Sequence, residues 1–103
     1  MPRMAPFLSL FPVPRTGVAS RLVDGVAVAV TPEDSTLHTF ENEVATEIWG
    51  LVDGQRSVGQ IVERIVERFD VERALAERDV VEFVKQLDEK GLVQLRSQAL
   101  ASP

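Results

Sequence analysis

The first part of the chain carries short apolar runs that are separated by turn residues. Residues 18–23 and 26–30 flank Asp24-Gly25, and such a pair between apolar runs is a strong signal for a two-residue β-hairpin, because both positions can adopt a positive φ. Valines and alanines alternate along residues 26–30, so we expect the larger valines to face the core. Residues 36–40 form a predicted third strand, and their Thr and His content suits a sheet edge.

After Glu41 the apolar positions follow the helical period in three segments. Polar residues that cap helices and a glycine suited to a left-handed C-terminal position mark their ends. The start of the third helix stays open, and residues 92–95 either add a last short strand or pack back as a tail. The predicted boundaries are Asn42 and Asp53-Gly54 for the first helix, a Ser57/Gln60 capping box opening the second, and Lys90-Gly91 closing the third.

Residues 1–14 contain four prolines and several large apolar side chains. Proline cannot donate a hydrogen bond to a sheet and disfavours helix at the preceding residue. We therefore expect an extended apolar arm that docks on a partner or on a second copy of the chain. It precedes a domain over residues 15–96 and a frayed tail over residues 97–103.

Composition narrows the class of protein further. A length of 103 residues holds one modest core, and the formal charge of −5 argues against a nucleic-acid partner. The longest apolar stretch, residues 26–30, is too short to span a bilayer. The start of the chain has no long apolar segment, so we expect no signal peptide and a cytoplasmic protein, which the lack of cysteine also fits.

Few residues could carry out catalysis. His38 is the single histidine of a chain without cysteine, so no His/Cys metal cluster or nucleophilic triad is expected, and no glycine spacing matches a phosphate-binding loop. The carboxylates are interpreted as solvated helix surface, with Arg78–Glu82 and Lys85–Glu89 as ion pairs one turn apart. Trp49 is interpreted as core. We expect a binding module that is not an enzyme and needs no cofactor.

Two features suggest where such a module binds. Residues 36–40 are a candidate free edge that could accept an extended peptide as a further strand. On the third helix, Val81 lies about 100° from the predicted core stripe, where it forms a flank with Lys85 and Asp88. Val81 either contributes to binding or packs under a neighbouring loop. The predicted fold is α+β and winged helix-turn-helix-like, with three short N-terminal antiparallel strands followed by three helices.

Several motifs between residues 18 and 95 resemble the PqqD-like family (coenzyme PQQ synthesis protein D-like), the peptide-binding domains called RiPP recognition elements. The order and spacing of these motifs is more specific than any one of them. The residues that carry the resemblance are Leu22-Val23-Asp24-Gly25-Val26-Ala27-Val28, Asn42-Glu43, Ile48-Trp49-Gly50-Leu51-Val52-Asp53-Gly54, Ser57-Val58, Ile61-Val62, Asp79-Val80, Phe83, Leu87 and Lys90-Gly91-Leu92-Val93.

The resemblance implies a non-catalytic module that binds the leader segment of a ribosomally made precursor peptide. The leader adds as a strand beside the third strand, in the groove against the third helix. The module then presents the precursor to a modifying enzyme such as a radical SAM protein or a cyclodehydratase. The peptide-binding residues implied here are Thr36, Leu37, His38, Thr39, Val81, Val84, Lys85 and Asp88.

The sequence departs from the family pattern at one position, because Glu41 stands where a Leu usually precedes the Asn, with Phe40 one place earlier. This departure predicts a bulge or a register change at the end of the third strand. Two other functions stay open. One is a winged-helix DNA-binding or transcription-associated domain, and the other is a self-assembling scaffold or homodimer whose own arm fills the groove.

Overall fold

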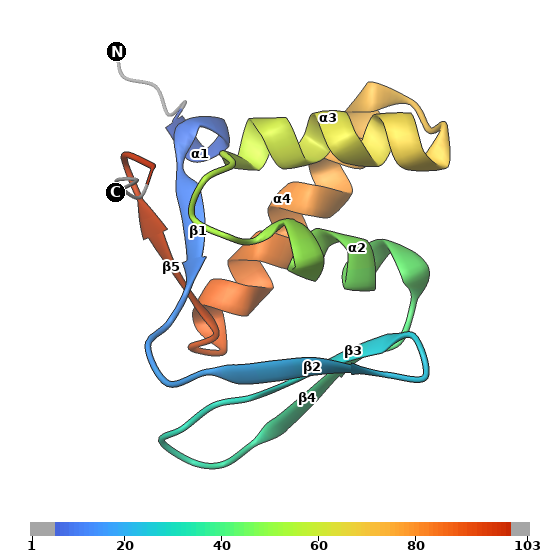
Figure 1. The fold of residues 1–103 in the computed structure, drawn as a ribbon. Coiled ribbons are helices and arrows are strands. Elements are labelled where there is room, and N and C mark those ends of the chain that lie inside the picture. Colours follow the sequence, from blue (N-terminus) through green and yellow to red (C-terminus); the bar gives the residue numbers. More distant parts are fainter. Residues whose placement is uncertain (1–5, 100–103) are drawn as a thin grey trace.

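The computed structural model describes residues 6–99. They form one α+β unit in which a three-stranded antiparallel sheet lies beneath a group of helices, with a two-stranded ribbon beside them (Figure 1). The predicted order of three strands followed by three helices is confirmed, with further elements at both ends. In chain order the elements are α1 (Pro6–Ser9), β1 (Phe11–Pro14), β2 (Ala19–Val23), β3 (Val26–Val30), β4 (Leu37–Phe40), α2 (Glu43–Leu51), α3 (Val58–Phe69), α4 (Arg73–Glu89) and β5 (Val93–Arg96).

The local sequence signals explain where the helices begin and end. The Asn42 side chain accepts the Ala45 N–H at the start of α2, and Ser57 and Gln60 form the predicted capping box at the start of α3. The third helix, whose start was open, begins at Arg73. Gly91, with φ of +76°, follows α4 and lets the chain turn into β5.

The core lies where the helices meet the sheet and the ribbon. Its fully buried side chains come from all three long helices and β5, among them Ile48, Ile61, Val80 and Val93. Trp49, at 8% exposure, is buried as predicted, and its ring centroid lies 5.4 Å from that of Phe40. Burial of these side chains supplies the main favourable free energy of folding.

On β3 the alanines face the core and the valines face away from it, which is the reverse of the prediction. Ala27 and Ala29 are 2% and 0% exposed, whereas Val26, Val28 and Val30 stay half-buried on the other face of the sheet. Small alanine side chains let α2 pack closely on the strand. The alternation of side chains along the strand is therefore confirmed, but side-chain size did not indicate which face of the sheet is buried.

Residues 6–14 of the proline-rich arm pack on the rest of the chain. Strand β1 pairs antiparallel with β5, and the Leu10 carbonyl accepts the Val58 N–H at the start of α3 at 2.8 Å. Short helix α1 contacts α3, and Phe7 and Leu8 pack on the core. Residues 1–5 of the arm and 100–103 of the predicted tail lie outside the described residues.

The two prolines of β1 fit a strand because of their spacing. Pro12 and Pro14 face Leu95 and Val93 in the register, and the Arg15 N–H bonds to the Leu92 carbonyl at 3.0 Å. Hydrogen-bonded pairs alternate in an antiparallel ladder, so the prolines occupy the positions whose backbone groups face away from β5. Accordingly, the Pro12 carbonyl accepts the Gly54 N–H instead, at 3.0 Å.

Two smaller predictions also need correction. The β3–β4 register runs without a bulge from Val30↔Leu37 to Ala27↔Phe40, so Glu41 does not disturb the strand. Among the described residues, neither Arg78–Glu82 nor Lys85–Glu89 forms an ion pair, and Arg78 Nε lies 3.8 Å from Asp79 Oδ1. Helix spacing permits the predicted pairs, but exposed side chains gain little from forming them.

Candidate functional site

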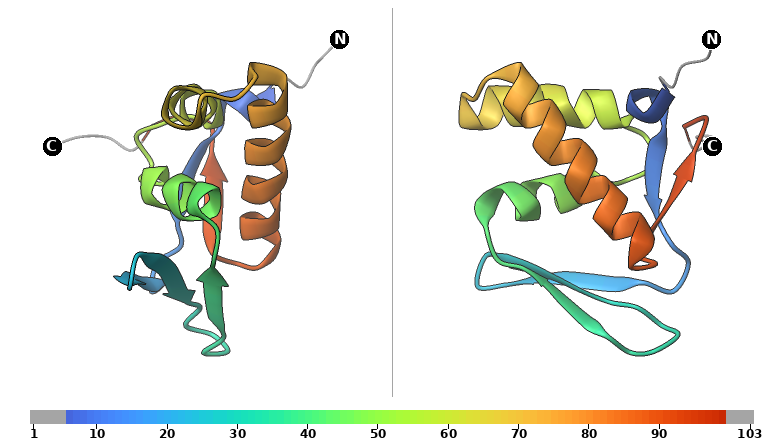
Figure 2. Two further views of the ribbon diagram at one scale, coloured as in Figure 1. Left: turned by 90° about the vertical axis from the view of Figure 1, so that its right-hand side faces the viewer. Right: turned by 180° about the vertical axis from the view of Figure 1, so that it is seen from behind.

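Strand β4 forms the edge of the three-stranded sheet on the side of α4, and β2 forms the other edge (Figure 2). The Thr31 N–H donates to the Thr36 carbonyl at 3.1 Å, immediately before β4. At the other end of β4, the Thr46 hydroxyl donates to the Phe40 carbonyl at 2.8 Å and accepts the Ala27 N–H at 3.4 Å. These contacts show that the backbone groups of Thr36 and Phe40 face β3.

The alternation of an antiparallel ladder then orients the residues between them. The backbone groups of His38 face β3, and those of Leu37 and Thr39 face outward. Within the described chain, β4 pairs with β3 and with no other strand. The outward N–H and C=O groups of Leu37 and Thr39 are therefore available to a further strand. By the same alternation, Ser20 and Leu22 direct their backbone groups to the free edge of β2.

A polar turn fixes the start of β4. The Asp34 carboxylate accepts hydrogen bonds from the Thr31 hydroxyl and from the Thr36 N–H. Both hydrogen bonds stabilise the charged carboxylate and hold the pKa of Asp34 below its ordinary value of 3.8. The Thr31 hydroxyl has the larger effect, and the Thr36 N–H has the next largest. The turn thus positions Thr36 directly before the strand begins at Leu37.

A groove of about 460 Å³ runs between β4 and α4. Thr39 and Leu37 lie on its strand side, and the α4 side is formed by one flank of the helix. The full lining is Leu37, His38, Thr39, Phe40, Glu41, Asn42, Ala45, Phe83, Gln86, Leu87 and Lys90. The Phe83 ring meets Phe40 edge-on at 5.5 Å, so the floor of the groove is aromatic.

His38 leaves a polar atom unsatisfied in this groove. Its Nε2 is buried and has no hydrogen-bond partner among the described residues. Buried polar atoms are rarely left unpaired, because losing water without gaining a partner costs free energy. The His38 imidazole therefore holds an unpaired polar atom beneath the surface of the groove.

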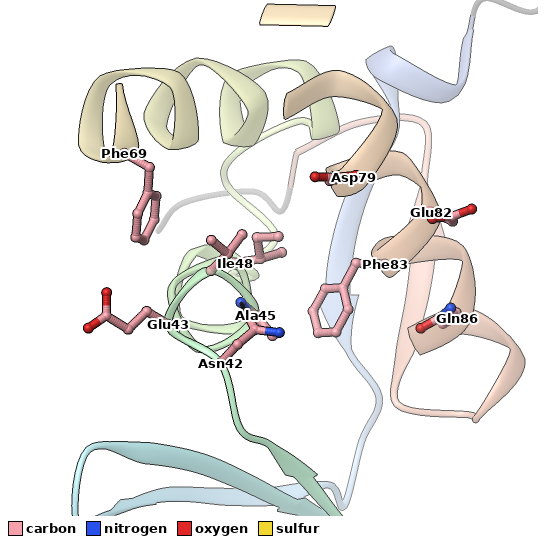
Figure 3. Close-up of a pocket in the computed structure, with 10 residues that line it drawn as sticks. Asn42, Glu43, Ala45, Ile48, Phe69, Asp79, Glu82, Phe83 and Gln86 are labelled. Atoms are coloured by element: carbon pink, nitrogen blue, oxygen red, sulfur yellow. Dashed lines mark hydrogen bonds between the residues drawn. The ribbon is translucent and has the colours of Figure 1, made fainter. Parts of the chain in front are cut away.

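A second cavity, of about 480 Å³, continues the groove past the end of β4. The two share Asn42, Ala45, Phe83 and Gln86. Figure 3 shows Phe83 projecting from α4 toward α2, with Phe69 extending from α3 above Glu43. The two cavities together form one surface, which we call the β4–α4 groove, from Leu37 to Phe69.

The structure brings the predicted strand residues to this groove, and Thr36 lies directly before them. It does not bring the predicted helix residues there. Val84 is fully buried, and the Lys85 ammonium lies 5.4 Å from the centroid of the Phe7 ring in α1. Val81 is half-buried one turn before Lys85, and Asp88 is exposed on the same flank. Val81 packs against the core, so it has the packing role of the two alternatives, although the neighbour on this flank is helix α1 and not a loop.

The error has a geometric cause. Successive helix residues are separated by about 100°, so Val81 and Phe83 lie on opposite flanks of the buried stripe of α4. Phe83 lies at i+3 from Val80, a position that either the core stripe or its flank can occupy. The residues that sequence reasoning missed are Phe69, Asp79, Glu82, Phe83, Gln86 and Lys90, and the i, i+3, i+4, i+7 spacing from Asp79 to Gln86 was the available signal.

Within residues 6–99, no group of three or more His, Cys, Asp or Glu side chains could hold a metal ion. No helix in that part of the chain is long and apolar enough to cross a membrane. On its open flank, α4 presents Asp79 and Glu82, a charge opposite to the one a DNA-reading helix needs. The arm is the occupant expected in a self-filled groove, and its described part, residues 6–14, packs on β5 and α3 instead.

The fold and the groove define a small α+β domain that offers a free strand edge to an extended chain. Residues 27–93 match the family described as coenzyme PQQ synthesis protein D (PqqD). The chain belongs to the PqqD family, as the resemblance in its sequence motifs indicated.

Individual relatives agree with this assignment. A "PqqA binding protein" of Rhodopseudomonas palustris (strain TIE-1) is 38% identical over 52 residues, which are 50% of this chain, and the chain spans about half (51%) of that relative. The structure of TbiB1 in complex with the TbiA(β) leader peptide has a TM-score of 0.73 at 26% identity, covering 80% of this chain and 94% of TbiB1. A lasso peptide synthetase B1, complexed with the leader peptide, has the same fold, with a TM-score of 0.69 at 23% identity over 81% of this chain and 96% of the synthetase chain.

Proposed function

We propose that this chain is a non-catalytic recognition module for a ribosomally made precursor peptide. The carrying observation is the free edge of β4, where Leu37 and Thr39 direct their backbone groups outward beside a groove against α4. An extended peptide adds to this edge as a strand, and its main-chain hydrogen bonds supply affinity at any sequence. Side chains on the groove side of the peptide meet Phe83 and His38, which supplies specificity.

The names of the relatives support the same function. One relative binds PqqA, and TbiB1 and a lasso peptide synthetase B1 were each solved with a leader peptide. The binding residues we propose are Leu37, His38 and Thr39 on the strand side, with Thr36 directly before them. On the helix side, Phe83, Gln86 and Lys90 replace the residues expected from the sequence. The bound precursor is presented to a modifying enzyme, for which a radical SAM protein or a cyclodehydratase is the proposed class.

A pair of proline variants tests the strand edge. Thr39→Pro removes an outward N–H from β4, and Ser20→Pro removes an outward N–H from β2 at the opposite edge of the same sheet. Both leave the ladder to β3 intact, because edge positions of this kind tolerate proline. The two proteins are therefore matched in chemistry and differ in the edge that they block.

The probes are synthetic PqqA and the short peptides encoded beside the gene of this chain, titrated by fluorescence anisotropy. We expect saturable binding of at least one peptide, weakened about tenfold or more by Thr39→Pro and unchanged by Ser20→Pro. Equal affinities of the two variants, or no binding to any of these peptides, would contradict the proposal.

A further inference from the structure

Past the end of β4, the β4–α4 groove has an apolar floor and an acidic rim. The floor is formed by Ala45, Ile48, Phe69 and Phe83, and the carboxylates of Glu43, Asp79 and Glu82 stand around it. Figure 3 shows Glu43 on one side of the cavity and Asp79 and Glu82 on α4 at the other. Among residues 6–99, no Lys or Arg lines this part of the groove.

Internal ion pairs do not account for these charges. Glu43 and Glu82 form no ion pair among the described residues, and Asp79 has one exposed contact, with Arg78 at 3.8 Å. Arg68 approaches the cavity, since its guanidinium lies 5.6 Å from the Phe69 ring centroid, but it also lies 3.5 Å from Glu47 Oε1. Glu43 stands in the first turn of α2, where the helix dipole stabilises a negative charge. Glu82 lies in the interior of α4, where the dipole gives its charge no such stabilisation.

Continuity with the strand edge identifies the occupant. The cavity shares Asn42, Ala45, Phe83 and Gln86 with the part of the groove beside β4, so a peptide that pairs with Leu37 and Thr39 runs directly into it. An apolar floor fits an apolar side chain of that peptide. Three carboxylates at the rim fit a neighbouring Lys or Arg.

We propose that this acidic-rimmed cavity is a second anchor that selects precursor peptides carrying an apolar residue next to a basic one, just beyond the strand-forming segment. The proposal rests on the proposed function, because it takes the peptide to be held at β4. Strand addition is tolerant of sequence, so the anchor sets which peptide is chosen. Its electrostatic part weakens with added salt, because the rim is exposed.

A random peptide library, displayed on phage and selected on the immobilised full-length protein, tests both ideas together. We expect the enriched peptides to carry Lys or Arg beside Leu, Ile or Phe at one end of a strand-forming segment. Selection on the Glu43→Lys/Glu82→Lys protein should replace the basic residue by Asp or Glu. Enriched peptides that need Thr39 but show no basic preference would overturn the anchor and leave the recognition function standing, whereas no enrichment on the wild-type protein would overturn both.

One enriched peptide then measures the size of the effect. Glu82→Gln should weaken its binding about threefold at low salt and less at high salt. Asp88→Asn, on the opposite flank of the same helix, is the matched control and should leave binding unchanged. Replacing the basic residue of the peptide by Gln should remove the difference between the wild-type and Glu82→Gln proteins, and a difference that persists would refute a direct contact.

Discussion

The two flanks of α4 differ in whether another part of the chain covers them. One flank carries Val81 and Lys85, and the N-terminal arm lies against it, with Phe7 beneath the Lys85 ammonium. The other flank carries Phe83 and Gln86 and stays open to the β4–α4 groove. Both flanks have one large apolar residue beside the core stripe, so apolar content alone does not show which flank binds a partner. The difference lies in which flank the chain covers by itself.

Removing the arm should have the largest effect on this comparison. A chain that begins at Arg15 lacks β1, the fully buried Pro12 and the contacts of Phe7 and Leu8 with the core. We expect its free energy of unfolding to fall by about 3 kcal/mol in urea titrations, because the core beneath β1 becomes exposed. Peptide affinity measured on the folded fraction should stay unchanged. A truncated chain of wild-type stability would show that the covered flank has no structural role.

Alanine substitutions on the two flanks of α4 should distinguish residues that contribute only to stability from residues that also bind the peptide. Phe83→Ala removes the edge-on contact with Phe40 and should cost about 2 kcal/mol of stability and weaken peptide binding about tenfold. Val81→Ala should cost about 1 kcal/mol and leave the peptide dissociation constant unchanged. Isothermal calorimetry and urea unfolding on both variants measure the two effects. Weaker binding in Val81→Ala would restore the flank that the sequence suggested.

The attachment of β4 to α2 offers a smaller test on the open side. Thr46 connects the Ala27 N–H and the Phe40 carbonyl through one hydroxyl. Thr46→Val keeps the shape and loses both hydrogen bonds, so the free energy of unfolding should fall by about 1 kcal/mol. Thr46→Ser should retain most of that stability. Equal unfolding midpoints for the two variants would show that the hydroxyl does not hold the strand.

Lowering the pH should destabilise the turn before β4, on the open side of α4, before it affects the β1–β5 ribbon on the covered side. This is the smallest effect that we expect. The folded-state pKa of Asp34 is lowered by the Thr31 hydroxyl and then by the Thr36 N–H, so its contribution is present above the unfolded value near 3.8 and is lost as pH falls through the folded-state pKa. On the covered side, Arg15 Nε donates to the Val93 carbonyl at 3.3 Å, and no carboxylate takes part in this contact. Amide protection at Thr31 and Thr36 should fall in acid sooner than at Val13 and Gln94, and Asp34→Asn should remove that pH dependence. A parallel fall at all four amides would contradict it.

Local signals in the sequence were sufficient to predict most of the elements. The Asp24-Gly25 hairpin, the Asn42 cap and the Ser57/Gln60 capping box each depend on neighbouring residues, and each was found where the sequence placed it. The strand side of the site followed from the same kind of signal, since the composition of residues 36–40 is typical of an edge.

What could not be predicted depends on contacts between distant segments. Which face of β3 is buried depends on how close α2 comes to the strand, and the open flank of α4 depends on where the arm docks. Periodicity gives the angle between Val81 and Phe83 but not the side from which a neighbour arrives. The cavity beyond β4 combines α2, α3 and α4, so no single segment of the sequence contains its pattern.

The spacing of the two prolines in β1 has a consequence for how the molecule behaves in a crowded solution. Along the outer margin of this strand, the positions that would present amide hydrogens to a newcomer are Pro12 and Pro14, which have none. An extended chain that approaches this margin finds no amide hydrogen, and the Pro12 carbonyl is already bonded to Gly54, so the margin offers little to strand pairing. The three-stranded sheet thus keeps an edge that can pair with another strand, whereas the outer edge of β1 lacks the amide hydrogens that such pairing needs.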